Sequence, residues 1–520
     1  MLAQVLSGAV LGVDAYFVYV EVDLASGLPA IAVVGLPEEA VREGRERVAA
    51  ALHNSGFALP PRRITINLAP ADVRKEGSAF DLPIALGILA CTGALPPGTL
   101  GRGCFVGELG LDGELRPVRG ALSLALRCRE AGVPFLALPA ANAPEAAIVD
   151  GIAVLPARSL ADVVRHLRGE RPLEPLRIDA ARIFPEPATP DVDYADVRGQ
   201  AHAKRALEVA AAGQHNVLLI GPPGSGKSML ARRLPTILPP LSLPEALETT
   251  RIHSVAGRLR PGQALLRERP FRAPHHTISD AGLVGGGAVP RPGEVSLAHH
   301  GVLFLDELPE FRRHVLDALR QPLEDGVVTI GRARLAVSYP ARFMLLGAMN
   351  PCPCGFFGTG DGRCICHPGQ VRRYVGRLSG PLLDRIDLHV DVPALRAAEL
   401  AGHPAGEPST RIRERVLAAR ERQAARFRHR PELFANAQMT ARDVTEFCTL
   451  DDDGHTVLRA AVQRLGLSAR AHHRVLKLAR TIADLEGEDR IRAGHVAEAV
   501  QYRSLDRLPR LAPGHAHAPA

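Results

Sequence analysis

Hydrophobic and polar residues in the first 165 positions follow two periods in turn, one of strands and one of helices. Segments 18–27 and 63–70 alternate apolar and polar side chains, and segment 30–37 is a continuous apolar run, which predicts three strands. Segment 38–56 has apolar positions at helical spacing and ends in Gly56, which predicts a helix. Segment 80–93 is apolar on all sides and predicts a buried helix. This part of the chain is therefore predicted to be an α/β domain.

The rest of the chain divides at changes in this pattern. A Pro-rich, charged stretch follows the first domain, and strand and helix patterns alternate again from about 193. From about 408 the pattern is mostly helical, and the last residues are small and polar. The predicted organisation is an N-terminal domain at 1–168, a linker at 169–192, a core at 193–395, a helical domain at 396–507 and a disordered tail at 508–520.

Composition adds a location and a class of partner. The 520 residues are 46% hydrophobic and 23% charged, which is typical of a globular protein, and the net charge of +7 is compatible with a polyanionic partner. The N-terminus lacks the basic start of a signal peptide, and no apolar stretch is long enough to span a bilayer. We therefore expect a cytoplasmic protein without a membrane partner, whose eight cysteines are reduced or metal-bound.

The segment GPPGSGKS, from Gly221 to Ser228, fits the phosphate-loop pattern G-x-x-x-x-G-K-[ST] and follows the apolar run Val217–Ile220. Backbone N–H groups of such a loop surround the β-phosphate, while Lys227 reaches the β/γ oxygens and Ser228 ligates Mg²⁺. A plain surface turn is the alternative interpretation. The candidate nucleotide-binding residues are Gly221, Pro222, Pro223, Gly224, Ser225, Gly226, Lys227, Ser228, Met229 and Asp306.

Two later strands end in polar side chains that suit ATP hydrolysis. The run Val302–Leu305 leads into Asp306, a candidate for holding Mg²⁺ together with Ser228, and Glu307, a candidate for polarising the attacking water. The run 343–349 ends at Asn350, which could hold that water against the γ-phosphate. The sequence therefore predicts an ATP hydrolase that needs ATP and Mg²⁺.

Arginines after the second strand complete the set of catalytic candidates. Arg385 lies in GPLLDRIDLHV, and an arginine at a subunit boundary can stabilise transition-state charge on a neighbour's ATP. Arg470 and Arg474 begin an amphipathic helix and could reach the γ-phosphate from a helical lid. A solvated helix face is the alternative for both. The predicted catalytic residues are Glu307, Asn350, Arg385 and Arg470.

These elements, in this order, resemble the AAA+ ATPases. The segment Asp196–Gln200 is similar to their N-terminal box, and Asn350, Arg385 and Arg470 occupy the sensor-1, arginine-finger and sensor-2 positions. Segments 269–287 and 327–343 resemble the helix-2 insert and the pre-sensor-1 hairpin, which magnesium chelatase subunits and MCM helicases also carry. The resemblance implies an AAA+ P-loop αβα core with both inserts and a C-terminal helical lid.

About 500 residues resemble the ComM/YifB family of magnesium-chelatase-like proteins, through APHHTISDAGLVGGG, GVLFLDELPEF, NPCPCG, SGPLLDRIDLHV and ARTIADL. The resemblance implies a homo-hexameric, ATP-driven helicase that promotes branch migration on single-stranded or branched DNA. Natural transformation or homologous recombination is the implied setting, with recombinase proteins as candidate partners. Alternatives are a metallochelatase ATPase, a protein-remodelling ATPase and, least favoured, an ATP-dependent protease.

The N-terminal domain carries two segments, 75–81 and 107–113, that resemble the Lon protease domain. Aligning the first puts Ala79 at the position of the serine nucleophile, and aligning the second puts Leu122 at the position of the lysine base. Ser78 is one residue away, and a serine without a base is an ordinary alcohol. The expectation is a Lon-like fold (ribosomal S5 domain 2-like) without protease activity, which supports assembly or DNA contact.

Four cysteines form the pattern C-x-C…C-x-C in a Gly-rich loop at 352–367. Four thiols so close in sequence could surround one tetrahedral Zn²⁺, with His367 as a substitute ligand, and reduced thiols are the alternative. The loop begins two residues after Asn350, so a metal there could couple the ATP state to a pore or a neighbour. The candidate zinc ligands are Cys352, Cys354, Cys364 and Cys366.

Candidate DNA contacts are basic residues on the two inserts. A motor that threads DNA binds backbone phosphates without reading bases. The segment Arg411–Arg430 holds eight arginines, but a solvated helix is its favoured interpretation. The candidate DNA contacts are Arg332 and Arg334 on the predicted hairpin and Arg269, Arg272, His275 and His276 on the other insert.

Overall fold

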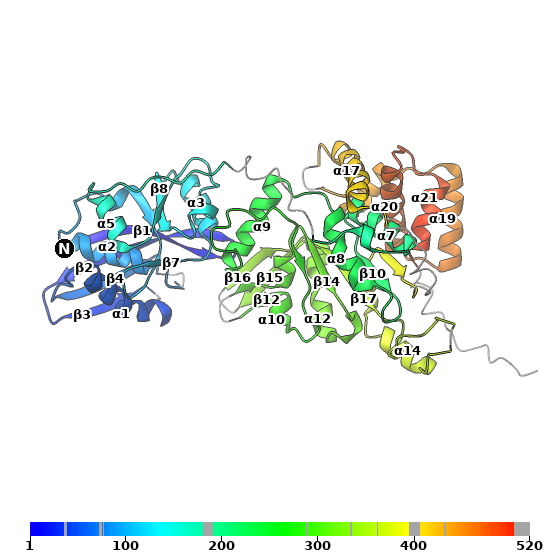
Figure 1. Ribbon diagram of the computed structural model, residues 1–520, viewed down its shortest axis with the longest axis horizontal. Coiled ribbons are helices and arrows are strands. Elements are labelled where there is room, and N and C mark those ends of the chain that lie inside the picture. Colours follow the sequence, from blue (N-terminus) through cyan, green and yellow to red (C-terminus); the bar gives the residue numbers. More distant parts are fainter. Residues whose placement is uncertain are drawn as a thin grey trace, which may run out of the picture.

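The computed structural model has three parts arranged along its long axis (Figure 1). A mixed sheet with helices lies at the N-terminal end, a parallel sheet with helices lies in the middle, and a helical part lies at the other end. The described residues are 1–35, 39–71, 75, 77–179, 191–287, 290–332, 335–360, 362–394, 406–430 and 433–503. The predicted tail at 508–520 lies outside them.

The N-terminal sheet has seven strands in the order β3-β4-β2-β1-β5-β8-β9. Its helices are α1 (Glu39–Asn54), α2 (Asp81–Cys91), α3 (Ala121–Glu130), α4 (Ala143–Ala146) and α5 (Leu160–Leu167). Its strands are β1 (Leu2–Leu11), β2 (Asp14–Ala25), β3 (Ala30–Val34), β4 (Arg63–Ala69), β5 (Gly103–Phe105), β8 (Phe135–Pro139) and β9 (Ala153–Ala157). A small pair, β6 (Glu108–Leu109) and β7 (Leu115–Arg116), lies beside them. The predicted strands and both predicted helices of this part are therefore present.

The central sheet is parallel, with the order β11-β14-β17-β10-β18. Every residue of β10, β14 and β17 is buried, because helices cover both faces of a parallel sheet and leave no polar side. The strands are β10 (Val217–Ile220), β11 (Phe271–Arg272), β14 (Val302–Leu305), β17 (Met344–Met349) and β18 (Leu388–Asp391). The helices are α7 (Ala201–Gly213), α8 (Lys227–Ile237), α9 (Leu243–Val255), α12 (Arg313–Ala318) and α13 (Arg320–Asp325).

Two small antiparallel pairs project from this core. The segment expected to form a hairpin does so, as β15 (Val327–Arg332) paired with β16 (Leu335–Pro340). The segment between β11 and β14 holds α10 (Asp280–Leu283), the pair β12 (Gly285–Gly286) and β13 (Arg291–Pro292), and α11 (Glu294–Leu297). Both insertions therefore leave the parallel sheet itself intact.

The C-terminal part is helical, as the pattern predicts. Its α17 (Ser409–Arg426) and α20 (Ala469–Leu485) pack on α7 of the core. The other helices of this part are α18 (Ala441–Phe447), α19 (Asp452–Leu465) and α21 (Ala493–Gln501). Two more helices, α14 (Pro368–Val375) and α15 (Gly380–Leu383), lie earlier in the chain, between β17 and β18. Within the described part of the chain, no helix combines the length and apolar character needed to cross a membrane.

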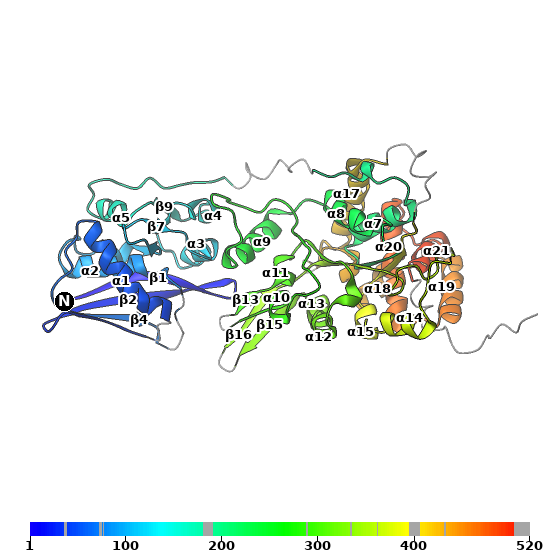
Figure 2. The ribbon, with the colours of Figure 1, turned by 60° about the horizontal axis from the view of Figure 1, so that its bottom comes forward.

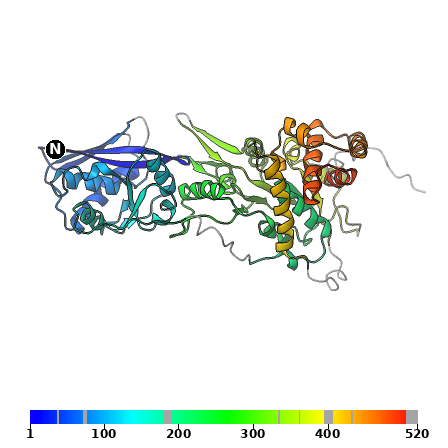
Figure 3. The ribbon, with the colours of Figure 1, turned by 90° about the horizontal axis from the view of Figure 1, so that it is seen from above.

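The N-terminal part meets the core at the turn between β1 and β2, which reaches the β15–β16 hairpin (Figures 2 and 3). Val13 packs against the apolar cluster that contains Val337 of the hairpin. Arg251 of α9 donates hydrogen bonds to Val13 O (3.1 Å) and Asp14 Oδ1 (2.7 Å). Ser123 of α3 donates to Val13 O at 2.6 Å, so the turn is held from both parts of the chain.

Candidate functional site

The phosphate loop runs from the end of β10 to the start of α8, as predicted. Gly224 and Gly226 have φ values of +76° and +94°, which side chains disfavour. A Cβ on Gly221 would lie 2.1 Å from Val392 O, so the sheet leaves no room for a side chain there. The loop therefore presents the N-terminus of α8 and its free N–H groups, which favour an anion.

Lys227 is the first residue of α8, and its side chain contacts the loop. Its Nζ donates hydrogen bonds to Gly221 O (2.7 Å), Pro222 O (2.9 Å) and Asn350 Oδ1 (3.2 Å). Burial lowers the pKa of Lys227, and the carboxylate of Asp306 opposes that change. The structure thus joins the loop lysine to the amide at the tip of β17.

Ser228 and Asp306 lie side by side where β14 ends. Ser228 Oγ donates a hydrogen bond to Asp306 Oδ2 at 2.7 Å. A hydroxyl and a carboxylate are hard oxygen donors, which Mg²⁺ prefers when it also binds phosphates. The donor set therefore fits the predicted Mg²⁺ site.

Glu307 has a backbone conformation that is uncommon for a residue with a side chain. Its φ is +52°, and its backbone N–H donates to Asp306 Oδ1 at 3.0 Å. Its carboxylate is 58% exposed and lies 3.5 Å from Nδ1 of His276. His276 was predicted to contact DNA or to pack, so its contact with Glu307 is a finding that the sequence did not reveal.

Gln200, the last residue of the predicted N-terminal box, bridges two parts of the nucleotide site. Its Nε2 donates hydrogen bonds to Ser225 O (3.2 Å) and Pro393 O (2.7 Å). Asp196 of the same box pairs with Arg233 of α8 at 2.8 Å. The box therefore supports the phosphate loop from the side of α7.

Arg385 and the phosphate loop lie at opposite ends of the strands of the central sheet. Arg385 is the residue farther from the nucleotide. It precedes β18, whose first residue Leu388 pairs with Val217, the first residue of β10. The loop follows the last residue of β10, so the strand separates the two by about 13 Å. Arg385 is paired with Glu324 of α13, and its side chain is 14% exposed.

Arg470 and Arg474 lie on the same side as Arg385. The hydrogen bond from Arg385 lowers the pKa of Glu324, and the charges of Arg470 and Arg474 lower it further. Arg474 also pairs with Asp387 at 2.9 Å. Burial alone would raise the pKa of Asp387, but Arg474 and His215 outweigh it and hold that pKa below its usual value. The expectation that Arg470 or Arg474 reaches the γ-phosphate from a helical lid stays a prediction.

Arg385, Arg474, Glu324 and Asp387 line a cleft of about 390 Å³ between the core and the helical part. Asn216 fixes the floor of this cleft. Its backbone N–H donates to Asp387 Oδ2 (3.0 Å), and its Nδ2 donates to Arg385 O (2.9 Å). The roles of Asn216, Glu324 and Asp387 were missed, because only the tertiary fold brings α13, β18 and α20 together.

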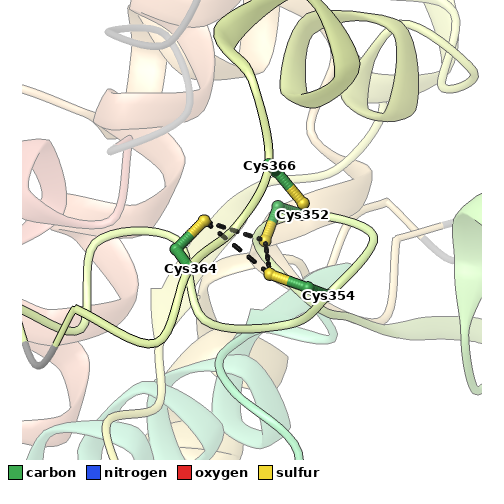
Figure 4. Close-up of side chains that lie close together, drawn as sticks. All are labelled: Cys352, Cys354, Cys364 and Cys366. Carbon is green, nitrogen blue, oxygen red and sulfur yellow. Dashed lines mark hydrogen bonds between the residues drawn. The ribbon is translucent and has the colours of Figure 1, made fainter.

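The four predicted zinc ligands meet in one cluster (Figure 4). Cys352 Sγ lies 3.3 Å from Cys354 Sγ and 3.8 Å from Cys364 Sγ, and the last two sulfurs are 3.7 Å apart. All four sulfur atoms, that of Cys366 included, lie within 4.8 Å of one another. His367 instead precedes α14 as its N-cap residue, where its backbone N–H donates to Gln370 Oε1 at 2.9 Å.

The candidate DNA contacts are less available than the sequence suggests. Arg272 pairs with Glu294 at 2.6 Å, and Arg269 pairs with Glu245 at 3.1 Å. His275 is exposed and stacks on His276 with ring centres 4.0 Å apart. Arg334 and the side chain of Arg332 lie outside the described residues. The segment Arg411–Arg430, expected to be a solvated helix rather than a DNA contact, lies largely in α17. Its arginines make several intramolecular ion pairs, such as Arg415 with Glu208.

The Lon-like segments offer no serine and lysine pair among the described residues at the aligned positions. Ser78 donates a hydrogen bond to the carboxylate of Glu108. Leu122 is fully buried in α3. A serine bonded to a carboxylate without a lysine at Leu122 lacks the arrangement expected of a nucleophile. That this domain does not cleave peptides stays a prediction from the sequence.

Models of the magnesium chelatase family match all three parts of the chain. The model described as magnesium chelatase, subunit ChlI, matches residues 193–400. A second ChlI model matches residues 20–142, and the model of the ChlI C-terminal part matches residues 406–503. Membership of this AAA+ family implies ATPase activity, with ATP and Mg²⁺ as its ligands.

Individual relatives cover the chain almost from end to end. It is 47% identical over 509 residues to the protein YifB of Salmonella typhimurium, with 98% of each chain covered. It is 47% identical over 514 residues to competence protein ComM of Haemophilus influenzae, again with 98% of each chain covered. Magnesium-chelatase subunit ChlI of Nicotiana tabacum is 25% identical over 326 residues, which is 56% of this chain and 67% of that protein. The chain belongs to the ComM/YifB family of magnesium-chelatase-like AAA+ proteins.

Proposed function

We propose that this protein is a hexameric, ATP-driven DNA motor that promotes branch migration of recombination intermediates in the cytoplasm. Natural transformation or homologous recombination is its proposed setting, and recombinase proteins are candidate partners. The observation that carries the proposal is the full-length similarity to a protein named for competence, at 47% identity. The phosphate loop supplies the ATP-driven part of the proposal.

The residues around the loop have distinct proposed roles in hydrolysis. Bound Mg²⁺ would neutralise charge on the β- and γ-phosphates. Lys227, which now bonds to two loop carbonyls, binds phosphate oxygens, and Ser228 and Asp306 hold the metal. Glu307 polarises the attacking water, and Asn350 orients it. The proposed metals are Mg²⁺ at this site and Zn²⁺ at the four cysteines.

The placement of the arginines supports the proposed ring. Arg385 lies at the far end of β10 from its own phosphate loop, so its proposed contact is with ATP on a neighbouring subunit. Arg470 and Arg474 share that end and are proposed to face the same neighbouring nucleotide. A head-to-tail interface of this kind closes into a ring when its rotation allows closure.

DNA is proposed to contact the two inserts. Arg332 and Arg334 of the hairpin and His275 of the other insert are the proposed phosphate contacts. Arg272 is a weaker candidate, because Glu294 already neutralises its charge. Such contacts carry no base readout, so binding is expected to weaken steeply with salt.

The test is ATP-dependent displacement of labelled strands from a synthetic four-way junction. Wild-type protein should displace strands, and Lys227→Ala should not. Absence of displacement, with ATP hydrolysis unchanged by any DNA, would contradict the proposal.

A second candidate function is a magnesium-chelatase-like or protein-remodelling ATPase. The observation that favours it is the match of all three parts of the chain to magnesium chelatase models. Hydrolysis that a protein client stimulates and DNA does not would support this alternative.

A further inference from the structure

The loop that carries the cysteine cluster is also a wall of the nucleotide site. We infer that Zn²⁺, bound by Cys352, Cys354, Cys364 and Cys366, holds this loop against the phosphate loop and so sets the affinity for ATP. The inference rests on the ATP site of the proposed function and not on its DNA part.

The sulfur positions fit a tetrahedral zinc site. With Zn–S bonds of about 2.3 Å, the sulfurs of a regular tetrahedron are about 3.8 Å apart. The three separations among Cys352, Cys354 and Cys364 are 3.3, 3.7 and 3.8 Å. A disulfide would need about 2.05 Å, so the thiols are grouped without being paired.

Groups around the thiols also suit a bound metal. The backbone N–H of Phe357 donates to Cys352 Sγ at 3.3 Å. Such N–H···S bonds orient thiolate ligands and balance their negative charge. Four protein thiolates leave no open position, which is typical of a structural zinc site.

The loop touches the phosphate loop at Gly355. This residue has φ +89°, and a Cβ built on it would lie 2.5 Å from Cδ of Pro223 and 3.9 Å from Cγ of Asn350. Its backbone N–H donates to Cys352 O at 3.0 Å, so a cysteine of the cluster fixes its position. The cysteine cluster is therefore connected to Pro223 of the phosphate loop through Gly355.

The far end of the loop returns to the same place. Helix α14 begins two residues after Cys366, and the backbone of Asn350 lies close enough to the hydroxyl of its Tyr374 to oppose the rise in the pKa of Tyr374 that burial causes. Asn350 contacts Lys227 and also precedes the first cysteine by two residues. Both ends of the cysteine loop thus meet at the residue that contacts the loop lysine.

The metal supplies the order that this loop lacks on its own. Between Met349 and Pro368 the described residues form no helix or strand, so few backbone bonds restrain them. Four bonds to one ion close this segment into short cycles and remove much of its conformational freedom. Without the metal, the loop is free to leave Pro223, and the phosphate loop loses one of its walls.

The first experiment measures zinc content and the affinity for a fluorescent ATP analogue, both without DNA. Wild-type protein, purified without chelator, should contain about one zinc per chain. Cys364→Ser should lose the zinc and bind the analogue roughly tenfold more weakly. Cys448→Ser, a buried cysteine outside the cluster, should retain both properties.

A matched pair of glycine variants separates zinc binding from its effect on the affinity for ATP. Gly355→Ala should keep its zinc and weaken binding of the analogue roughly tenfold, because its Cβ displaces Pro223. Gly358→Ala is the control: its φ of +81° imposes similar backbone strain, but nothing lies within 4 Å of its Cβ. It should keep both the zinc and the affinity.

Two results would overturn the inference. One is wild-type protein with well under one zinc per chain. The other is unchanged affinity in both Cys364→Ser and Gly355→Ala. Since neither readout involves DNA, a failure of branch migration would leave the inference intact, whereas wild-type protein that binds no ATP would overturn it together with the proposed function.

Discussion

Glu307 is held by its backbone and by His276 rather than by a packed side chain. Its φ is +52°, and its carboxylate lies 3.5 Å from Nδ1 of His276. Because the carboxylate is 58% exposed, replacing it should not unfold the site. The residue is therefore a clean target for testing catalysis.

Glu307→Gln should lower the rate of ATP hydrolysis by about 10²–10⁴-fold, since an amide cannot accept a proton from water. Its affinity for ATP should stay near that of the wild type, because Lys227, Ser228 and Asp306 are unchanged. Steady-state hydrolysis and binding of a fluorescent ATP analogue measure the two effects. Hydrolysis at the wild-type rate would assign the water to another residue.

His299 makes stability depend on pH. Burial lowers its pKa to about 4, and its Nδ1 accepts a hydrogen bond from Arg342 N at 2.9 Å. The unfolded state, with a pKa near 6.5, binds a proton that the folded state does not bind between pH 6.5 and 4. Stability from His299 is therefore full above pH 6.5 and is lost as pH falls to 4.

Lowering the pH from 7 to 5 should cost the wild type about 2 kcal/mol of unfolding free energy through His299. His299→Asn keeps an acceptor for Arg342 N but cannot take up the proton, so its loss over the same range should be smaller by that amount. Denaturant unfolding at the two pH values measures the difference. Equal losses in both proteins would place the titration elsewhere.

At the scale of elements, the local sequence pattern predicted many of the helices and strands but few of the contacts between them. Period-2 and helical patterns located β2, α1, β4 and α2, and continuous apolar runs located the strands beside the phosphate loop. The Gly-rich loop also placed Lys227, Ser228 and Asp306 together, because the carboxyl ends of parallel strands meet at one edge. The helix that carries Arg470 was predicted, but not that it lies with Arg385. Periodicity describes one face of a helix and says nothing about which edge of a sheet it packs against.

Contacts between loops could not be predicted from the sequence, for a related reason. The approach of Gly355 to Pro223 depends on a positive φ and on the course of an irregular loop. The contact between His276 and Glu307 joins the segment after β11 to the segment after β14. No local spacing in the sequence relates these two segments. Both contacts are set by tertiary packing alone.

The β1–β2 turn is the element that links the N-terminal part to the hairpin. Val13→Asp would place a charge in the apolar cluster that contains Val337, which costs about 1–3 kcal/mol when no partner compensates it. We expect faster hydrogen exchange in β15 and β16, while exchange in β10 and β17 stays unchanged. Leu28→Asp is the control, because Leu28 is 87% exposed. Unaltered exchange in the hairpin would mean that the turn does not brace it.

At the scale of the whole molecule, the phosphate loop and Arg385 lie at opposite ends of the strands of the central sheet. Lys227, Asp306 and Glu307 follow the carboxyl ends of β10 and β14. Arg385 instead precedes the amino end of β18. In the proposed ring, a single chain would provide half of each of two sites. Hydrolysis would then be a property of the interface between subunits.

This arrangement predicts complementation between two inactive proteins. Lys227→Ala cannot bind the phosphates, and Arg385→Ala should lose about 10³–10⁵-fold in rate while still binding ATP. When the two are mixed, an interface is intact if the Arg385→Ala subunit provides the phosphate loop and the Lys227→Ala subunit provides the arginine. Random assembly at equal amounts makes about a quarter of the interfaces intact in a head-to-tail ring.

The mixture should therefore hydrolyse ATP well above either protein alone. The matched control mixes Lys227→Ala with Glu307→Gln, whose defects lie on the same side of the interface. Every interface in that mixture has a defective phosphate-loop side, so no activity should return. An Arg385 that served its own chain would leave both mixtures inactive, because each chain would then carry its defect into its own site.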